Sequence, residues 1–253
     1  MQTFTTTTIT TFTTITILLN NDHLLNCGQR IFDFKRNDCM KRIILYAACL
    51  LLFTGCAMGQ TGNDFAALPK PTAGEEVATF GGGCFWSMSE AMSELKGVNK
   101  VVSGYAGGTV KNPTYEEVSS KTTGHAESVQ IYYDPKVISF TTLATAFFFA
   151  HDPTELNYQG PDEGTEYRSI VFYRTPEEKT ILEDVIKKIN QSKHYPAAIV
   201  TQVMPFKAFY PAEKYHQGYY RLNGDNPYIA QVSEPKVMKF RKAMKAELKP
   251  EFR

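Results

Sequence analysis

The run Gly81-Gly82-Gly83-Cys84-Phe85-Trp86 constrains the fold of this chain more than any other segment. It follows a short apolar stretch that ends at Phe80 and precedes apolar residues at helical spacing. Three glycines let the backbone turn sharply without clashes from side chains. The run therefore predicts a strand that reaches Phe80, a tight turn, and a helix that begins at Phe85.

A cysteine at the start of a helix lies beside unpaired N–H groups and the positive end of the helix dipole. These effects lower the pKa of a thiol and favour the thiolate, which is the nucleophilic form. Cys84 is therefore a candidate nucleophile. The competing interpretation is a buried structural cysteine beside a core tryptophan, because free cysteine is often buried.

Composition bounds the class of protein. The chain has 253 residues, 43% of them hydrophobic, and a formal net charge of +1, which fits one globular domain plus an extension. The basic residues between 236 and 245 recur at helical spacing among apolar residues and predict a solvated helix face, so we expect no nucleic-acid partner. No Cys or His pair in the domain has the spacing of metal ligands, and we expect no metal site.

The N-terminal quarter differs in composition from the rest. Residues 1–39 begin with a threonine-rich stretch and predict a non-native or disordered extension, which leaves Met1 and Met40 as alternative starts. Residues 40–56 carry a basic pair, an apolar run too short to span a bilayer, and then Thr54-Gly55-Cys56. This pattern is similar to a lipoprotein signal peptide with Cys56 as the lipidated residue. The alternatives are an ordinary signal peptide or a buried apolar segment.

Residues 57–75 are rich in Gly, Ala, Pro, Thr and Lys and predict a flexible tether between a membrane anchor and the domain. With the signal and Cys56, the tether predicts an exported protein of the bacterial cell envelope, held on the periplasmic face by lipid.

Residues 76–253 predict one domain. Strands are expected at 100–105, 127–133 and 169–174, a helix that ends near Gly97 is expected after the glycine turn, and a last strand is expected at 198–204. Ser139 and Thr175 are expected to cap helices. Helices and strands interleave without a regular βαβ rhythm, which predicts an α+β fold, a two-layer sandwich with a mixed sheet.

Further candidate residues lie in polar segments. Glu127 begins a predicted strand, and a desolvated glutamate that faces a pocket stays neutral and can donate a proton; the competing interpretation is a surface residue. His125 is a candidate base for Cys84 or a structural histidine. Tyr115 and Tyr167 each lie in a loop, where a phenol either packs half-buried or donates a hydrogen bond to a ligand.

Eight motifs, in order and spacing, resemble those of the type A peptide methionine sulfoxide reductases, over the whole predicted domain. They are Gly83-Cys84-Phe85-Trp86, Ser103-Gly104-Tyr105-Ala106-Gly107-Gly108, Asn112-Pro113-Thr114-Tyr115, Thr123-Gly124-His125-Ala126-Glu127, Tyr133-Asp134-Pro135, His151-Asp152-Pro153-Thr154, Gln159-Gly160-Pro161-Asp162 and Tyr167-Arg168-Ser169.

The resemblance implies a reaction and roles for residues. Cys84 would attack the sulfur of an (S)-methionine sulfoxide and become a sulfenic acid. Glu127 would protonate the sulfoxide oxygen with help from the phenols of Tyr115 and Tyr167. Phe85 and Trp86, with Tyr167, would hold the S-methyl group, and Asp162 would order that wall. No bound cofactor is implied.

Two departures from the family pattern have consequences. No cysteine follows Cys84, and Ser119 stands where many members carry one, so a disulfide within the domain is impossible. Resolution then falls to an external thiol, which is a thioredoxin-like or glutaredoxin-like protein or a small thiol, or else to an unlipidated Cys56. Glu166 stands where many relatives have glutamine, and a salt bridge with Arg168 or another partner would mute its charge.

Two other function classes compete with the reductase. A cysteine hydrolase would use Cys84 with His125 or His151 as base, would form an acyl-enzyme and would need no reductant. A lipid-anchored binding module would use its tyrosines only to grip a partner, and Cys84→Ser would leave its binding intact.

Overall fold

The computed structural model describes residues 64–253. The predicted extension at 1–39, the predicted signal peptide at 40–56 with Cys56, and the first part of the predicted tether lie outside the described residues.

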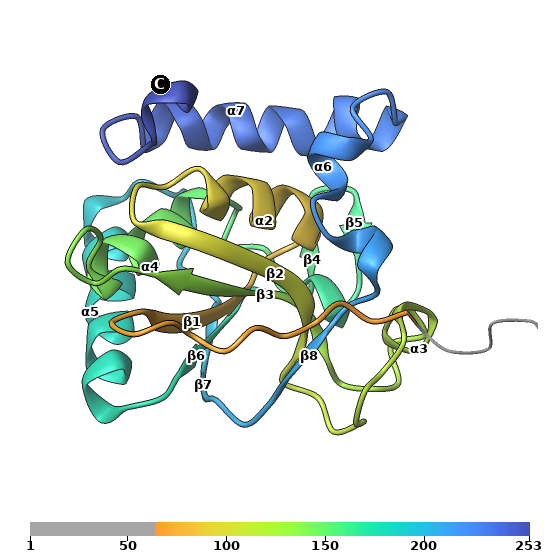
Figure 1. Cartoon of the computed structure of the whole chain (residues 1–253). Helices are drawn as coiled ribbons and strands as arrows, with labels where there is room; N and C mark the ends of the chain where they lie inside the picture. Colours follow the sequence, from red (N-terminus) through yellow and green to blue (C-terminus); the bar gives the residue numbers. More distant parts are fainter. Residues whose placement is uncertain (1–63) are drawn as a thin grey trace, which may run out of the picture. The chain divides into compact units, whose positions relative to one another are not determined.

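A six-stranded mixed sheet with the order β7-β6-β1-β3-β2-β8 forms the centre of the described part (Figure 1). Neighbouring strands are antiparallel except β6 and β7, which are parallel. The strands are β1 (Glu76–Gly81), β2 (Val98–Ala106), β3 (Ala126–Tyr133), β6 (Ile170–Tyr173), β7 (Gln202–Pro205) and β8 (Phe209–Pro211). A separate ribbon pairs β4 (Tyr158–Gln159) with β5 (Asp162–Glu163).

Some helices connect these strands along the chain, and others follow the last strand. The α-helices are α2 (Phe85–Ser93), α3 (Tyr115–Ser119), α4 (Phe140–Phe149), α5 (Pro176–Ser192), α6 (Tyr219–Leu222) and α7 (Glu234–Ala243). Shorter helical turns are η1 (Thr165–Tyr167), η2 (Lys214–His216), η3 (Ile229–Ser233) and η4 (Pro250–Phe252). The α+β architecture with a mixed sheet confirms the fold class expected from the sequence.

The two faces of the sheet are covered differently. The main core packs helices on one face, with Phe80, Phe147 and Phe240 among its fully buried residues. The other face carries a smaller cluster that includes Tyr132 and Phe172. Every residue of β3 is buried, in place of the alternation with polar or exposed positions that the sequence predicts for this strand, because β3 is central and both of its faces are covered.

The C-terminal helix α7 packs on α2, which lies between α7 and the sheet (Figure 1). Two ion pairs connect the C-terminal region to α2 and to the residue that directly follows α2. Arg241 contacts the fully buried carboxylate of Glu94 at 2.7 Å, and Arg221 contacts the buried Glu90 at 2.7 Å. Loss of either arginine would leave a buried carboxylate without its partner, which is costly.

The predicted helix caps are present, because capping depends on residues close in sequence. The Ser139 hydroxyl accepts from Thr142 N, and the Thr175 hydroxyl accepts from Glu178 N. Elements that depend on distant packing differ more. Helix α2 ends at Ser93 rather than near Gly97, and the strand expected at 198–204 is the shorter β7.

Residues 64–75 form what we call the N-terminal strap. The sequence predicts that they belong to a flexible tether, but in the structure they lie along the domain. Lys214 N donates to Asp64 O at 2.8 Å, and Ala66 N donates to Ala212 O at 2.9 Å. The described part of the expected tether is therefore bound to the domain between β8 and η2.

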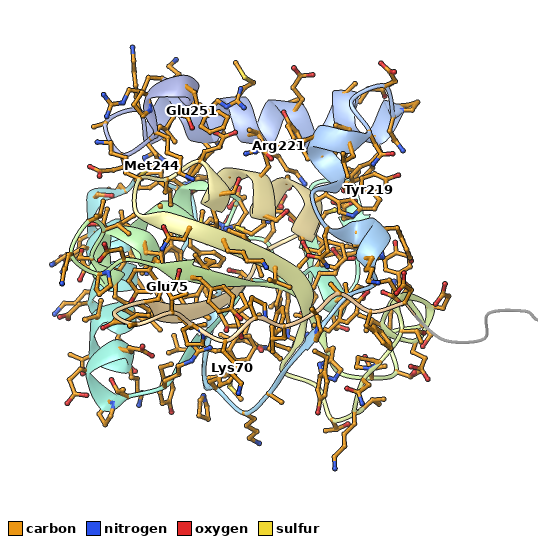
Figure 2. The ribbon with its side chains drawn as sticks, in the orientation of Figure 1. Lys70, Glu75, Tyr219, Arg221, Met244 and Glu251 are labelled. Carbon is orange, nitrogen blue, oxygen red and sulfur yellow. The ribbon has the colours of Figure 1, made fainter. Side chains whose placement is uncertain are left out.

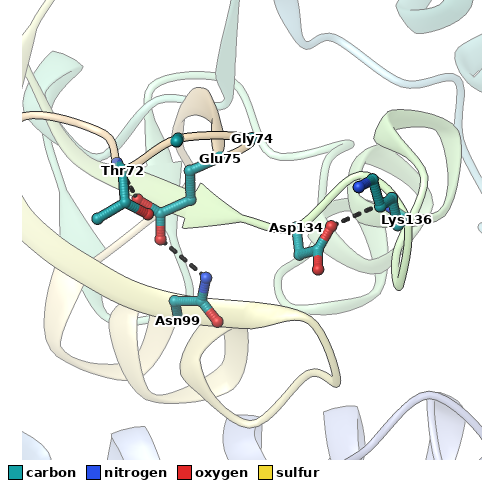
Figure 3. Close-up of a pocket in the computed structure, with 7 residues that line it drawn as sticks. Thr72, Gly74, Glu75, Asn99, Asp134 and Lys136 are labelled. Atoms are coloured by element: carbon teal, nitrogen blue, oxygen red, sulfur yellow. Dashed lines mark hydrogen bonds between the residues drawn. The ribbon is translucent and has the colours of Figure 1, made fainter.

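Side-chain hydrogen bonds also fix the C-terminal end of the N-terminal strap. Tyr132, on the second face of the sheet, donates its hydroxyl to Pro69 O at 2.7 Å. The Glu75 carboxylate accepts from Thr72 N and from Asn99 Nδ2, both at 2.8 Å (Figure 3). Thr72, Glu75 and Asn99 line a cavity of about 110 Å³, together with Asp134 and Lys136 on the other side.

Candidate active site

The glycine turn places Cys84 at the start of α2. Gly81 ends β1, and a Cβ on it would lie 2.6 Å from Glu127 O of the neighbouring β3, so only glycine allows this close approach. Gly83 has a φ of +72°, a left-handed conformation that glycine adopts readily. Its N–H donates to Tyr167 O at 3.0 Å. The turn therefore joins the cysteine, the central strand and the Tyr167 loop.

A cavity of about 260 Å³ opens beside Cys84. It shares no lining residue with the cavity near Glu75. Its lining residues are Cys84, Trp86, Tyr115, Glu127, Asp162, Tyr167, Asn226 and Tyr228. Six of these were candidates from the sequence, and the structure brings all six together although they are spread along the chain from Cys84 to Tyr167.

Phe85 differs from the expectation. It is 1% exposed and is absent from the cavity lining, because its ring packs inward against Tyr105 and His216 at centroid distances of 5.9 and 4.9 Å. Its contribution to the site is its backbone N–H, which donates to Glu127 Oε2 at 2.9 Å. Trp86, the next residue, supplies an aromatic wall.

Glu127 is a buried acid. It is 3% exposed because β3 lies between β1 and β2, and burial raises its pKa to about 8 against the opposing effect of the Phe85 N–H. At neutral pH the carboxyl is therefore mainly protonated, as the sequence argument expects for a desolvated glutamate. Oε2 accepts from Phe85 N, which leaves Oε1 free to donate a proton to a bound ligand.

Cys84 is 6% exposed, and its pKa corrects the sequence argument. Burial and the charge of Glu127 raise the pKa of the thiol, and these effects outweigh that of the Trp86 backbone N–H, which lowers it. The position of Cys84 at the start of the helix is therefore not sufficient to stabilise its thiolate form. Protonation of Glu127 removes this repulsion. The thiolate of Cys84 therefore forms more readily when Glu127 is neutral.

Three tyrosine side chains line the cavity together with Cys84. Burial raises the pKa of Tyr115 and of Tyr167, so both hydroxyls keep their protons and can donate. The Tyr228 hydroxyl donates to Asp162 Oδ2 at 2.7 Å, and Lys236 Nζ lies 3.4 Å from the same oxygen. Asp162 thus orders a third phenol, which the sequence analysis did not identify.

The histidines expected as alternative bases do not line the cavity. His125 Nδ1 accepts from Gly108 N, and its Nε2 lies 2.7 Å from Val110 O. His151 bonds Phe147 O and the Ser169 hydroxyl through its two ring nitrogens. Both rings are committed to structural hydrogen bonds, which removes the base that a cysteine hydrolase needs.

Glu166 also differs from the expectation of a salt bridge. It is 4% exposed, and among residues 64–253 no basic nitrogen lies within 4.0 Å of its carboxylate. Its Oε2 has no hydrogen-bond partner there. Arg168 instead bonds the carbonyl oxygens of Thr165 and Gly124 and the side chain of Gln202.

Residues after β8 complete the wall formed by Trp86. The Tyr219 ring stacks on the indole at 3.8 Å and 10°, and Tyr228 meets it edge-on at 5.7 Å. Trp86 Nε1 donates to His216 Nδ1 at 3.1 Å. Tyr219 and Arg221 of α6 lie beside α2 (Figure 2). The turn-forming residues Asn226 and Pro227 before Tyr228 are a sequence signal that could have drawn attention to this phenol.

No group of three or more His, Cys, Asp or Glu residues within 64–253 could hold a metal ion. In the same range, no helix is both long and apolar enough to cross a membrane.

Comparison with known proteins gives consistent matches. A family model described as peptide methionine sulfoxide reductase matches residues 76–248. A Haloquadratum walsbyi protein named peptide methionine sulfoxide reductase MsrA is 50% identical over 173 residues, which are 68% of this chain and 98% of that protein. A Thermus thermophilus protein of the same name is 47% identical over 176 residues, 70% of this chain and 99% of that protein.

Solved structures show the same fold. Reduced Mxr1 from Saccharomyces cerevisiae superposes with a TM-score of 0.58 and 34% identity, covering 62% of this chain and 91% of that one. Methionine sulfoxide reductase A of Corynebacterium diphtheriae gives a TM-score of 0.55 and 29% identity, covering 66% of this chain and 91% of that one.

Proposed function

Because the chain belongs to the peptide methionine sulfoxide reductase family, we propose that it repairs oxidised proteins by reducing peptidyl and free methionine (S)-sulfoxide at Cys84. The chain is an oxidoreductase. The observation that carries the proposal is the shared cavity of Cys84 and a buried, protonated Glu127.

The first step is an oxygen transfer. The Cys84 sulfur attacks the sulfoxide sulfur while Glu127 gives its Oε1 proton to the sulfoxide oxygen, and the thiol proton restores the acid. The attack forms a bond between the two sulfur atoms. This bond and the S–O bond of the sulfoxide then break as the protonated oxygen moves to the Cys84 sulfur, and methionine leaves as the thioether. Cys84 keeps the oxygen as a sulfenic acid, so methionine is reduced by two electrons and the cysteine is oxidised by two.

The other lining residues position the sulfoxide. Tyr115 and Tyr167 donate hydrogen bonds to the oxygen on which negative charge develops, which stabilises the transition state. The indole of Trp86, with the Tyr167 ring, forms the apolar wall for the S-methyl group, and Asp162 orders that wall through Tyr228. A sulfoxide held by its methyl group, its oxygen and the attacking sulfur fits in one configuration only, which explains selectivity for the S-epimer.

The second step needs a thiol from outside the domain. The sequence has no cysteine after Cys84, so we propose a single catalytic cysteine. A thioredoxin-like or glutaredoxin-like protein, or a small thiol, attacks the sulfenic acid and releases water. A second thiol then reduces the mixed disulfide and restores Cys84. An unlipidated Cys56 is the alternative attacking thiol.

Single-turnover chemistry tests the proposal. In a variant with Cys27, Cys39, Cys49 and Cys56 replaced by serine, Cys84 is the only thiol. Without reductant it should form one equivalent of methionine from the S-epimer of a sulfoxide peptide and none from the R-epimer. Added small thiol should restart turnover. Failure to form the first equivalent with reduced Cys84 would contradict the assignment.

The cellular setting is part of the proposal. The sequence of residues 40–56 supports a lipoprotein signal peptide, with Cys56 lipidated and the enzyme anchored in the bacterial cell envelope on the periplasmic face. Labelled fatty acid should enter the wild-type protein in cells and should not enter Cys56→Ala. Absence of label from the wild type would refute the lipid anchor and leave the reductase assignment unaffected.

A further inference from the structure

Lys236 is a largely buried cation at the start of α7. The sequence predicts a solvated helix face for the basic residues between 236 and 245, but the Lys236 side chain is only 19% exposed. The start of α7 lies on the same side of the molecule as β5 (Figure 1). The charged residues nearest to Lys236 on the helix, Glu234 and Lys239, are exposed. The prediction of a solvated face is therefore wrong at Lys236.

The ammonium group of Lys236 reaches the wall of the cavity. Its Nζ lies 3.4 Å from Asp162 Oδ2 and 3.5 Å from Gln159 O, and both partners belong to the β4–β5 ribbon. The same carboxylate oxygen accepts from the Tyr228 hydroxyl at 2.7 Å. Among residues 64–253, no other basic side chain lies within 4.0 Å of a carboxylate that lines the cavity. In this part of the chain, Lys236 is thus the only cation paired with an acid of the cavity wall.

The groups around Glu127 are otherwise neutral or negative. Burial raises the pKa of Glu127, and so do the charges of Asp162 and Glu166, whereas the charge of Lys236 lowers it. Burial lowers the pKa of His151, which faces Lys236, to about 4, so this ring is neutral at pH 7. The other titratable groups that face Glu127 carry no positive charge in either protonation state; they are Cys84, Tyr105, Tyr115 and Tyr167.

The first step of the proposed reaction creates negative charge in this buried place. The Cys84 thiol gives up its proton, and Glu127 becomes a carboxylate when its own proton moves to the sulfoxide oxygen. A buried anion without a counter-charge is costly. A cation that is fixed in place before the reaction stabilises such charge without reorganisation. The resting thiol and acid are neutral and gain less from the cation, so its effect is greater in the transition state than in the resting enzyme.

We propose that Lys236 is a positioning residue that pairs with Asp162 and offsets the negative charge that forms on Cys84 and Glu127 during sulfoxide reduction. The proposal rests on the proposed reductase activity. Lys236 does not line the cavity, so it touches neither the substrate nor the reacting sulfur. Its loss should lower the rate of the first step and leave KM close to the wild-type value.

Three replacements separate the charge of Lys236 from its packing. Lys236→Met keeps much of the length without charge, Lys236→Gln keeps a hydrogen-bond donor without charge, and Lys236→Arg keeps the charge. The single-turnover rate of both uncharged variants should fall about tenfold, which corresponds to one unit in the pKa of an anion that loses its cation. Lys236→Arg should recover most of this loss. Lys239→Met is the matched control and should keep the wild-type rate, because Lys239 is an exposed lysine of the same helix.

The pH profile gives a readout that a purely structural role would not move. The charge of Lys236 lowers the pKa of Glu127, so without this charge the protonated, donating form persists to higher pH. The alkaline fall of the wild-type rate is expected near pH 8, and it should move to higher pH in Lys236→Met and Lys236→Gln. It should stay in place in Lys236→Arg and in Lys239→Met.

Alkylation of Cys84 tests the same charge without any sulfoxide. In the variant that keeps Cys84 as its only thiol, iodoacetamide modifies the thiolate, and removal of a nearby cation disfavours that form. At one fixed pH, alkylation should be slower with Lys236→Met or Lys236→Gln and unchanged with Lys239→Met. This result from an enzyme that reduces no sulfoxide would refute the proposed function alone.

The proposal would be overturned by folded Lys236→Met and Lys236→Gln proteins with the wild-type rate and the wild-type position of the alkaline fall. A slower rate with no shift in pH and no change in alkylation would overturn it as well, because altered packing would explain that result. Circular dichroism checks that each variant is folded. Lys236→Gln, which keeps a donor for Asp162, decides the question if Lys236→Met does not fold.

Discussion

Replacing Glu127 with glutamine removes the acid proton while keeping the shape of the side chain. Glutamine can still accept from Phe85 N with its carbonyl oxygen, so the hydrogen bond of 2.9 Å that orients the carboxyl is retained. What is lost is the proton donor toward the sulfoxide oxygen. General acid catalysis typically contributes 10²- to 10⁴-fold, so we expect the single-turnover rate to fall by roughly that factor, about 3–5 kcal/mol in the barrier.

The pH dependence provides a second measure of the same group. The pKa of Glu127 is raised to about 8, so the donating, protonated form prevails below that pH and disappears above it. Ionised Glu127 also raises the pKa of Cys84, so both effects reduce the rate in the same direction. The wild-type rate of methionine formation should therefore fall as the pH rises through about 8, and the Glu127→Gln rate should show no such fall.

The assay is rapid-quench measurement of the first equivalent of methionine from pH 6 to 10. Glu166→Gln is the matched control, because Glu166 is another buried carboxyl that does not line the cavity. Its charge contributes to the raised pKa of Glu127, so the control should keep its rate at neutral pH and move the alkaline fall to slightly lower pH. A Glu127→Gln rate within threefold of wild type, or a fall near pH 8 that survives in it, would refute Glu127 as the acid.

Three further perturbations test other parts of the structure. Tyr228→Phe removes the hydroxyl that donates to Asp162, and the single-turnover rate should fall by roughly tenfold; an unchanged rate would show that the third phenol is dispensable. Gly83→Ala should lower the free energy of unfolding by about 1–2 kcal/mol or more in denaturant titration, because alanine disfavours a φ of +72° and its Cβ would meet the Gln159 side chain at 2.5 Å; wild-type stability would contradict this. Cys84→Ser should fold as the wild type does by circular dichroism but form no methionine at all.

The sequence was most informative where local chemistry or motif order decides the outcome. The caps at Ser139 and Thr175 form as expected, because a hydroxyl and an N–H three residues later meet in any helix start. Six of the candidate residues meet in one cavity, because their motifs match those of a family with a common fold.

The sequence was least informative where distant packing decides. Periodicity around Glu127 predicts a strand with alternating burial, but neighbours on both faces bury all of β3. The contribution of Tyr228 and His216 depends on how the segment after β8 returns to α2, and no local pattern encodes that path. The pKa of Cys84 was misjudged because the helix start is local, whereas burial and the charge of Glu127 come from the tertiary structure.

The N-terminal strap bears on where the cooperative unit of this protein begins. The match to the family starts at residue 76, but backbone hydrogen bonds tie Asp64 and Ala66 to Lys214 and Ala212. In a chain cut at Glu76, the amide of Lys214 would lose its acceptor, and the segment that carries His216 would open more often in local fluctuations. The test is amide hydrogen exchange in this segment, which should be faster in the cut chain than in the uncut chain. That result would mean that the cooperatively folded unit begins at Asp64, twelve residues before the start of the family match at residue 76.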